Sequence, residues 1–225
     1  IVPQVRGREI YRPLDEIVKE VEERVTEGTR EVTLLGQTAN SYHLSGSKGS
    51  ATDFSDLLEA VARVNGIERI RFMSPHPYYM TERVVDAMTT IPAVCEGVHL
   101  PVQSGSNVIL KSMLRNYTRE SYLELIDRLR LAMPGIVIST DIIVGFPGET
   151  KNHFKQTLSL IEEVQFDWGF VFKYSARKGT AAADLDCYPT QLIEERHQEC
   201  LEVLNRVGLV KRRGLVGTIQ EVLLE

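Results

Sequence analysis

Five short segments of this sequence combine small residues with amide, hydroxyl or charged side chains. Each follows an apolar, strand-like run, and they read "GQTANSY" (36–42), "SPHP" (74–77), "PVQSGS" (101–106), "GFPGET" (145–150) and "KYSARKGT" (173–180). Small residues let the backbone approach a ligand closely, and the polar groups beside them can orient it. A single such segment would mean little, but five of them indicate a polar pocket that several parts of the chain build together.

Three polar side chains lie within or directly after these apolar runs. Asp141 interrupts the run "IVISTDIIVGF", where an unpaired carboxylate would cost free energy, so we expect a partner or a ligand for it. Gln103 and Lys173 are weaker examples of the same pattern. The sequence contains neither a recognisable nucleophile–base–acid triad nor a phosphate-binding GxxxxGKS loop.

Other residues have an ordinary structural explanation as well as a functional one. His76, between two prolines, fits a ligand-binding residue and a turn residue equally well, whereas His99 is more typical of a hydrogen-bonded core histidine. Gly145 and Glu149, taken alone, fit a turn before a helix. The aromatic run "FDWGFVF" (166–172) is more typical of core packing than of a surface that stacks on bases.

The elements that must position these segments alternate along the chain. Strand-like runs lie at 31–37, 69–75, 97–103, 136–146 and 166–175. Helical patterns lie between them, one of them at 13–28, and a long helix is expected at about 189–211. N-caps of further helices are expected at Asp53, Thr81, Thr118 and Thr150. Alternation at this spacing predicts βαβ units and a parallel sheet.

Ligands of a parallel α/β sheet bind at the carboxyl ends of its strands, so the five polar segments would share one rim. Five strands are too few for an eight-stranded barrel, which leaves an open doubly wound sheet or a partial barrel. Residues 43–52 are expected to form a mobile loop. The stretch "TIQEVLLE" (218–225) alternates like the first strand of a second domain, so we expect the chain to be a piece of a longer protein.

Composition excludes some classes of protein. Of the 225 residues, 43% are hydrophobic and 25% charged, which is ordinary for a soluble globular protein. The formal net charge of −5 argues against a general electrostatic grip on nucleic acid, but not against a local basic face. No apolar run approaches the roughly 20 residues that cross a bilayer. The three cysteines have no metal-binding spacing, and their odd number fits a reducing cytoplasm.

Together the segments resemble the radical S-adenosylmethionine methylthiotransferases, and within them the MiaB type. The motifs that carry this resemblance are "IVPQVRGRE", "EVTLLGQTANSY", "RIRFMSPHP", "HLPVQSGSNVILKSMLRNYTRESYLELI", "STDIIVGFPGET" and "FKYSARKGTAAA". They cover essentially the whole chain in order, which is far more specific than one glycine-rich loop. "GRE" with "LLGQTANSY" resembles the branch that acts on N6-isopentenyladenosine in tRNA, although Gln4-Val5 and Thr38-Ala39 depart from the usual pattern.

The resemblance implies a fold, cofactors and a reaction. The fold is an α/β, TIM-like partial (βα)6 barrel without its first strand over residues 1–211, and residues 212–225 would begin a small RNA-binding β-barrel domain called TRAM. The cofactors are S-adenosylmethionine and two [4Fe–4S] clusters, the catalytic one held by a CxxxCxxC motif expected just before Ile1, with no cluster ligand inside this chain. The reaction adds a methylthio group to C2 of isopentenyladenosine at position 37 of tRNA by radical chemistry.

The resemblance also places contacts to S-adenosylmethionine at the strand ends. Gly36 and Gln37 stand where related enzymes hold the methionine amino group, and Gln103 and Ser104 stand at the end that contacts the ribose. The other implied contacts are Asp141, Ile143 and Gly145, which resemble a GxIxG adenine motif, then Glu149, one position off the usual glutamate, and Lys173, Tyr174 and Arg177. Lys173 and Arg177 fit the methionine carboxylate and an RNA phosphate equally well. No catalytic residue is assigned.

Basic residues are expected to contact RNA or to line the entrance, namely Arg6, Arg8, Arg12, Lys211, Arg212 and Arg213. The implied partners are tRNA, through an anticodon-loop adenosine, and an electron donor. A monomeric cytoplasmic enzyme without membrane contact is expected. The alternatives are the same chemistry on threonylcarbamoyladenosine or on a ribosomal-protein aspartate, and a non-catalytic barrel module without a cluster.

Overall fold

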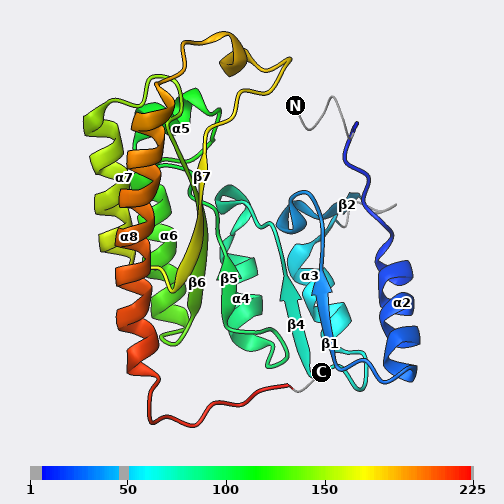
Figure 1. The fold of residues 1–225 in the computed structure, drawn as a ribbon. Coiled ribbons are helices and arrows are strands. Elements are labelled where there is room, and N and C mark those ends of the chain that lie inside the picture. The colour runs from blue at the N-terminus through cyan, green and yellow to red at the C-terminus, as the bar shows by residue number, and fades with distance from the viewer. Residues whose placement is uncertain (1–6, 46–50, 224–225) are drawn as a thin grey trace.

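Five parallel strands form one continuous wall in the computed structural model, which describes residues 7–45 and 51–223. They are β1 (Glu31–Leu34), β4 (Arg69–Phe72), β5 (Gly97–His99), β6 (Val137–Val144) and β7 (Trp168–Lys173). β1 pairs with β4, and β6 pairs with both β5 and β7. A parallel bridge between Ile70 and Val94 joins the two groups. The strands therefore follow one another in space in chain order, as in a barrel wall (Figure 1).

Helices cover one face of this wall. They are α2 (Leu14–Thr26), α3 (Phe54–Ala62), α4 (Glu82–Thr90), α5 (Asn107–Ser112), α6 (Arg119–Ala132), α7 (Lys151–Val164) and α8 (Thr190–Gly214). Neighbouring helices contact one another in the order α2, α3, α4, α6, α7 and α8, and α8 also packs on β6 and β7. The opposite face of the strands carries no helix in the described part of the chain, and we call it the open face.

The predicted alternation of strands and helices is confirmed, although the strands are shorter than the apolar runs that predicted them. Strand length ranges from three residues in β5 to eight in β6. All four predicted N-caps accept a hydrogen bond from a backbone N–H in the first turn of their helices, at Asp53, Thr81, Thr118 and Thr150. The caps were predictable because they depend on local side-chain chemistry alone.

Two connecting segments differ from expectation. Residues 43–52 were expected to form a mobile loop, but the described residues on its two sides belong to strands β2 (His43–Ser45) and β3 (Ala51–Asp53), which pair antiparallel. Residues 46–50 lie outside the described residues. Leu44 of β2 packs against the hydrophobic core, so tertiary contact outweighs the loop-like composition. Helix α5 was not predicted, because six residues are too few to show a helical period.

The chain after α8 does not form the expected strand within its described residues. The helix ends at Gly214, residues 215–217 form a turn, and residues 218–223 have no regular secondary structure. Ile219 and Val222 are exposed. A lone strand has no neighbour for its backbone groups, and alternation alone cannot supply one. The assignment of 212–225 to a second domain therefore stays a prediction.

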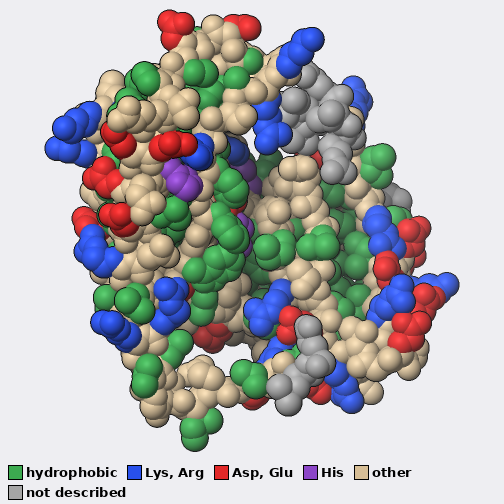
Figure 2. All heavy atoms as spheres, viewed as in Figure 1, with side chains coloured by type: hydrophobic (Ala, Val, Ile, Leu, Met, Phe, Trp, Pro, Cys, Tyr) green, Lys and Arg blue, Asp and Glu red, His purple; other side chains and the backbone are tan. Residues whose placement is uncertain are grey.

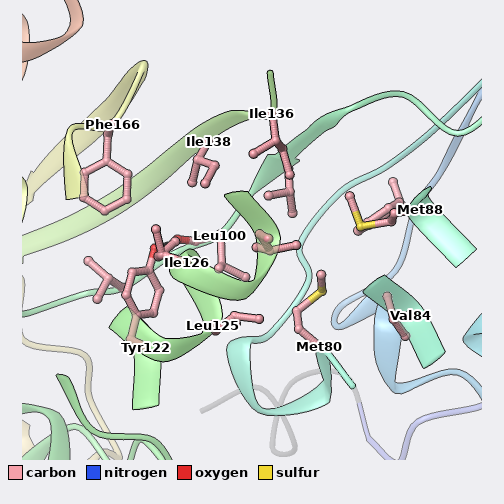
Figure 3. Packing of buried hydrophobic residues seen from close by; sticks show 14 of the residues in the cluster. Met80, Val84, Met88, Leu100, Tyr122, Leu125, Ile126, Ile136, Ile138 and Phe166 are labelled. Carbon is pink, nitrogen blue, oxygen red and sulfur yellow. Dashed lines mark hydrogen bonds between the residues drawn. The ribbon is translucent and has the colours of Figure 1, made fainter. Parts of the chain in front are cut away.

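The hydrophobic core lies between the strands and the helices. Figure 3 shows Leu125 and Ile126 of α6 near Tyr122, with Ile138 of β6 on the sheet side. Tyr122 is fully buried, and its hydroxyl donates a hydrogen bond of 2.8 Å to the backbone oxygen of Leu100. This bond satisfies the polar atom of the buried ring and holds the chain directly after β5 against α6.

The loop after β5 approaches α7 so closely at Gly105 that no side chain fits. A Cβ atom there would lie 2.4 Å from the backbone oxygen of Gln156 and 2.7 Å from Cα of Thr157. The Gly105 N–H donates to the Thr157 hydroxyl at 3.0 Å, and the fully buried Ser104 hydroxyl lies 3.3 Å from the same oxygen. The position of the "QSGS" loop therefore depends on glycine.

A buried ion pair fastens α8 to the turn that follows β6. Oε2 of the fully buried Glu149 accepts hydrogen bonds from the Gly145 N–H at 2.9 Å and from Arg196 at 2.8 Å. The Arg196 guanidinium also lies over the rings of Phe154 and Tyr188, 5.5 and 4.9 Å from their centroids. Burial raises the pKa of Glu149, whereas the hydrogen bond from Gly145 and the charge of Arg196 act in the opposite direction.

The substitution Arg196→Ala is expected to lower the free energy of unfolding by about 3–5 kcal/mol, because it leaves the buried carboxylate of Glu149 without its cation. Urea denaturation followed by circular dichroism measures the loss. Arg206→Ala is the matched control on the same helix, since Arg206 forms an exposed ion pair with Glu162 at 2.6 Å, and such pairs contribute less than about 1 kcal/mol. Equal losses of unfolding free energy in the two variants would show that the buried ion pair does not stabilise the fold more than an exposed one.

The substitution Gly105→Ala is expected to cost about 1–3 kcal/mol of stability, because the new methyl group overlaps the α7 backbone. Thermal melting of the variant and of Gly97→Ala provides the comparison. The nearest atom to a Cβ at Gly97 lies 3.8 Å away, so that strand position has room for a methyl group. A melting temperature of Gly105→Ala at or above that of Gly97→Ala would show that the loop can move aside.

Candidate active site at the strand ends

The carboxyl ends of the five strands lie along one rim, because all of the strands are parallel. The polar segments predicted from the sequence follow β1, β4, β5, β6 and β7 in that order. The expectation that these segments share one rim is therefore confirmed. The contacts of the individual residues with a cofactor stay predictions.

A cavity of about 1200 Å³ lies beside β1 and reaches the first polar segment. The amino-terminal segment, α2 and the end of β1 line it, and Arg8, Arg12, Gly36 and Gln37 are among the lining residues. Arg12 forms an exposed ion pair with Glu20 at 2.6 Å. Two of the basic residues expected at the entrance thus border the same cavity as the first pair of expected cofactor contacts. Arg6 lies outside the described residues.

Two hydrogen bonds tie the ends of β1 and β4 together. The buried Asn40 side chain donates to the His76 backbone oxygen at 3.0 Å and accepts from the His76 N–H at 2.8 Å. Nδ1 of His76 accepts from the Tyr78 N–H at 3.2 Å, and burial together with Arg115 lowers the pKa of His76. The structure supports the turn explanation for His76. Asn40 was missed as a positioning residue, although it belongs to the first polar segment.

Gln103 occupies a strained backbone position at the end of the β5 segment. Its φ angle is 68°, in the left-handed region, which costs a non-glycine residue about 1–3 kcal/mol. The Gln103 N–H donates to the Asp141 backbone oxygen, and the Gln103 oxygen accepts from the Ile143 N–H. The pairing with β6 therefore holds the strain in place. Such strain is concentrated at functional sites, which favours the prediction that Gln103 contacts a ligand.

Asp141 lies on the open face of β6 with a carboxylate that the protein satisfies only in part. Its Oδ1 is buried and has no hydrogen-bond partner among the described residues. Nε2 of His99 lies 3.3 Å from that oxygen without hydrogen-bond alignment, and Nδ1 of His99 is 2.9 Å from the Ser139 hydroxyl. His99 is mostly buried and hydrogen-bonded to Ser139, with which it is in register, as expected of a core histidine, and its ring also lies beside Asp141.

The end of β6 and the turn after it contain both accessible residues and buried residues that hold the backbone in place. Ile143 is partly buried and in register with Phe172 of β7. Gly145 has φ of 76°, and a Cβ there would lie 2.7 Å from the Ile193 side chain. Glu149 is fully buried against Arg196, so its carboxylate has no surface to offer a ligand. Glu149 and the fully buried Ser104 thus hold neighbouring backbone in place, and their expected contacts with a cofactor stay predictions. Arg196 was missed, because nothing local in the sequence pairs it with Glu149.

The expected residues after β7 lie at the rim with protein partners of their own. Lys173 is 3.4 Å from Glu194, and the Tyr174 hydroxyl donates to the Ala182 backbone oxygen at 2.8 Å. Arg177 is exposed. Lys173 and Arg177 remain available to an anion, because both are accessible at the rim.

The basic cluster at the end of α8 lies at the opposite edge of the sheet. Lys211 pairs with Asp167 at 3.0 Å, and Arg212 donates to the Asp167 backbone oxygen at 3.2 Å. Asp167 directly precedes β7, so these residues, with the exposed Arg213, lie at the amino ends of the strands. Because α8 runs antiparallel to β7, Lys211, Arg212 and Arg213 lie away from the rim that carries the polar segments. Contact with RNA at that edge stays a prediction.

Aromatic side chains of β7 line the open face. Trp168, Phe170 and Phe172 form what we call the aromatic ladder, in which the ring centroids of neighbours lie 5.4 and 6.2 Å apart. The expectation of core packing holds only for Phe166, which is fully buried. Figure 2 shows the molecule hollowed between the β7 half and the β1 half, with hydrophobic and histidine side chains at the hollow.

The described residues contain no group of three histidine, cysteine or acidic side chains that could hold a metal ion. Cys200 is buried, where burial raises the pKa of its thiol to about 12, and Cys187 is exposed in the segment before α8. Among the helices of the described ranges, none is both long and apolar enough to span a membrane.

Known proteins with similar sequences match this chain over its whole length. A protein from Moorella thermoacetica named tRNA-2-methylthio-N(6)-dimethylallyladenosine synthase is 50% identical over 226 residues, covering 100% of this chain and 50% of the relative. A protein of the same name from Clostridium botulinum is 46% identical with the same coverage. The chain spans about half the length of the curated relatives it matches.

Solved structures and a family model agree on the fold. Coproporphyrinogen III oxidase from Escherichia coli, described as a radical SAM enzyme, superposes with a TM-score of 0.64 at 17% identity, covering 90% of this chain and 52% of that one. Methylornithine synthase superposes with a TM-score of 0.54 at 16% identity, covering 88% and 56%. The model of the radical SAM superfamily matches residues 1–161. With its parallel strands, polar rim and matching family model, this chain belongs to the radical SAM superfamily.

Proposed function

We propose that this chain is part of a tRNA methylthiotransferase that adds a methylthio group to C2 of N6-isopentenyladenosine at position 37. The observation that carries the proposal is identity of 45–50% along the whole chain to synthases named for that nucleoside, whose dimethylallyl group is the isopentenyl group. We further propose a partial (βα)6 barrel completed by a strand beside β1 and a TRAM domain beginning at about residue 212. Strand β1 lies at the edge of the described sheet, so its free side can pair with a further strand, which supports the proposed completion of the barrel.

The strand ends fit S-adenosylmethionine as a bound cofactor. The exposed Gln37 amide and the backbone at Gly36 offer acceptors for an ammonium group, next to a large cavity. The partly exposed carboxylate of Asp141, which has no lysine or arginine partner among the described residues, can accept a hydrogen bond from a hydroxyl or amine. Lys173 and Arg177 can neutralise a carboxylate. When bound beside a [4Fe–4S] cluster, this cofactor supplies the radical chemistry that activates an unreactive C–H bond.

The cluster itself does not fit on the described residues. The three cysteines lie apart, on the chain before β5, on the segment before α8 and within α8, and they do not converge on one point. Thiolates normally hold such clusters. The contribution of this chain is therefore to bind and orient the cofactor and the nucleoside and to exclude water from the open face. We propose an external electron donor and a monomeric cytoplasmic enzyme.

Loss of this gene product is expected to remove the methylthio group from isopentenyladenosine in bulk tRNA and to leave isopentenyladenosine itself in its place. Mass spectrometry of nucleosides from a deletion strain measures both compounds. The same samples separate the alternative substrates, since threonylcarbamoyladenosine derivatives and the ribosomal-protein aspartate have their own masses. A methylthio-isopentenyladenosine level equal to that of the parent strain would refute the proposed function.

Gln103→Ala and Asp141→Ala in the full-length protein are expected to slow reductive cleavage of S-adenosylmethionine at least tenfold, because each removes a hydrogen-bonding group at the rim, worth roughly 1.4 kcal/mol or more. Chromatographic assay of 5′-deoxyadenosine gives the rate. Ser112→Ala is the control, since its hydroxyl bonds only to the backbone oxygen of Val108 on the exposed surface of α5. Wild-type rates in both rim variants would show that the pocket is wrongly assigned.

A further inference from the structure

The aromatic ladder exposes more apolar surface than packing of the described residues requires. Trp168, Phe170 and Phe172 are 41%, 53% and 49% exposed. The residues between them face the helices instead, because Val171 is buried and a Cβ at Gly169 would touch the Leu204 side chain of α8. Large exposed aromatic groups inside a concave site are typical of ligand-binding surfaces.

The charged surroundings of the ladder restrict what can bind there. Asp141 is in register with Phe170, and the ring of His99 stacks on Trp168 with centroids 5.7 Å apart and an interplanar angle of 23°. Throughout the described part of the chain, no lysine or arginine lies within ion-pair distance of Asp141. An anionic group beside Phe170 would therefore meet the carboxylate of Asp141, whereas the rim cation Lys173 follows the ladder at its other end, after Phe172.

Building on the proposed function, we propose that the aromatic ladder binds the isopentenyl group on N6 of the substrate adenosine and selects for it. This group is a branched five-carbon hydrocarbon without charge. Its contact with the ring faces removes apolar surface from water and so contributes favourable binding free energy. The threonylcarbamoyl and aspartate groups of the alternative substrates both carry a carboxylate. Asp141 lies beside Phe170, so repulsion between like charges disfavours binding of these groups on the ladder. The structure thus favours the prenylated nucleoside among the three substrates.

The direction of the ladder fits this role. Phe172 lies next to the rim residues Lys173 and Tyr174, whereas Trp168 begins β7 at the amino end of the strand. The ladder therefore runs along β7 from the rim, at Phe172, to the opposite edge of the sheet, at Trp168. An adenine held at the rim can extend its N6 substituent along Phe170 toward Trp168, while Phe172 stays beside the expected cofactor contacts.

The test uses the full-length protein and two anticodon stem-loop RNAs that differ only in the isopentenyl group. Fluorescence anisotropy gives the dissociation constant of each RNA, and the ratio of the two constants measures selection. The wild type is expected to prefer the prenylated RNA by about tenfold or more. Trp168→Ala and Phe170→Ala are each expected to reduce that ratio to within about twofold of unity, whereas Phe170→Leu, which keeps an apolar side chain, retains most of it.

Leu131→Ala is the matched control, because Leu131 is an exposed apolar residue on α6, away from the open face. It is expected to leave the ratio unchanged, and melting curves confirm that each variant folds. A wild-type ratio in Phe170→Ala and Trp168→Ala, or an equal loss of affinity for both RNAs, would overturn the inference. Mass spectrometry of the reacted RNA separates the two proposals, since methylthiolation of the prenylated RNA upholds the proposed function even where selection is absent.

Discussion

The pairing of β6 with a neighbour on each side is the constraint on which the rest of this structure depends. The eight residues of β6 hydrogen-bond to β5 and β7, and they place Ile138 and Ile142 in the core on one face and Asp141 on the other. The same pairing continues past β5 and holds Gln103 in a left-handed conformation. Because side chains alternate along a strand, stability and the candidate site come from the same eight residues.

The residues around the site divide into those that offer atoms to a ligand and those that hold the backbone still. Asn40, Ser104, Glu149 and Arg196 are buried and hydrogen-bonded, and each ties a strand end to a second element. Buried polar groups with hydrogen-bond partners are held in place, since breaking such a bond leaves a buried group unsatisfied. A rim of this kind keeps its geometry without ligand, which is what positioning of a reactive cofactor requires.

Local chemistry made much of the fold predictable. The N-caps, the alternation of strand and helix, and the five polar segments after the strands are encoded within a few residues of each feature. The pairing of β2 with β3 and the helix α5 were not predictable in this way. Contact of Leu44 with the core and the short length of α5 hide them from periodicity. The position of Lys211 away from the polar rim was not predictable, because it depends on the direction in which α8 crosses the sheet.

The sequence by itself determined the family, the order of the elements and the rim on which polar groups gather, since these follow from motifs and from the parallel arrangement. Only the tertiary structure decided which of those groups are accessible and which are enclosed. Glu149 and Asp141 are both acidic residues near the end of β6, yet one is enclosed by Arg196 and the other faces the open side of the sheet. The same holds for the aromatic run, in which Phe166 is buried and Phe170 is exposed. Burial is set by contacts between distant segments, and no local pattern records them.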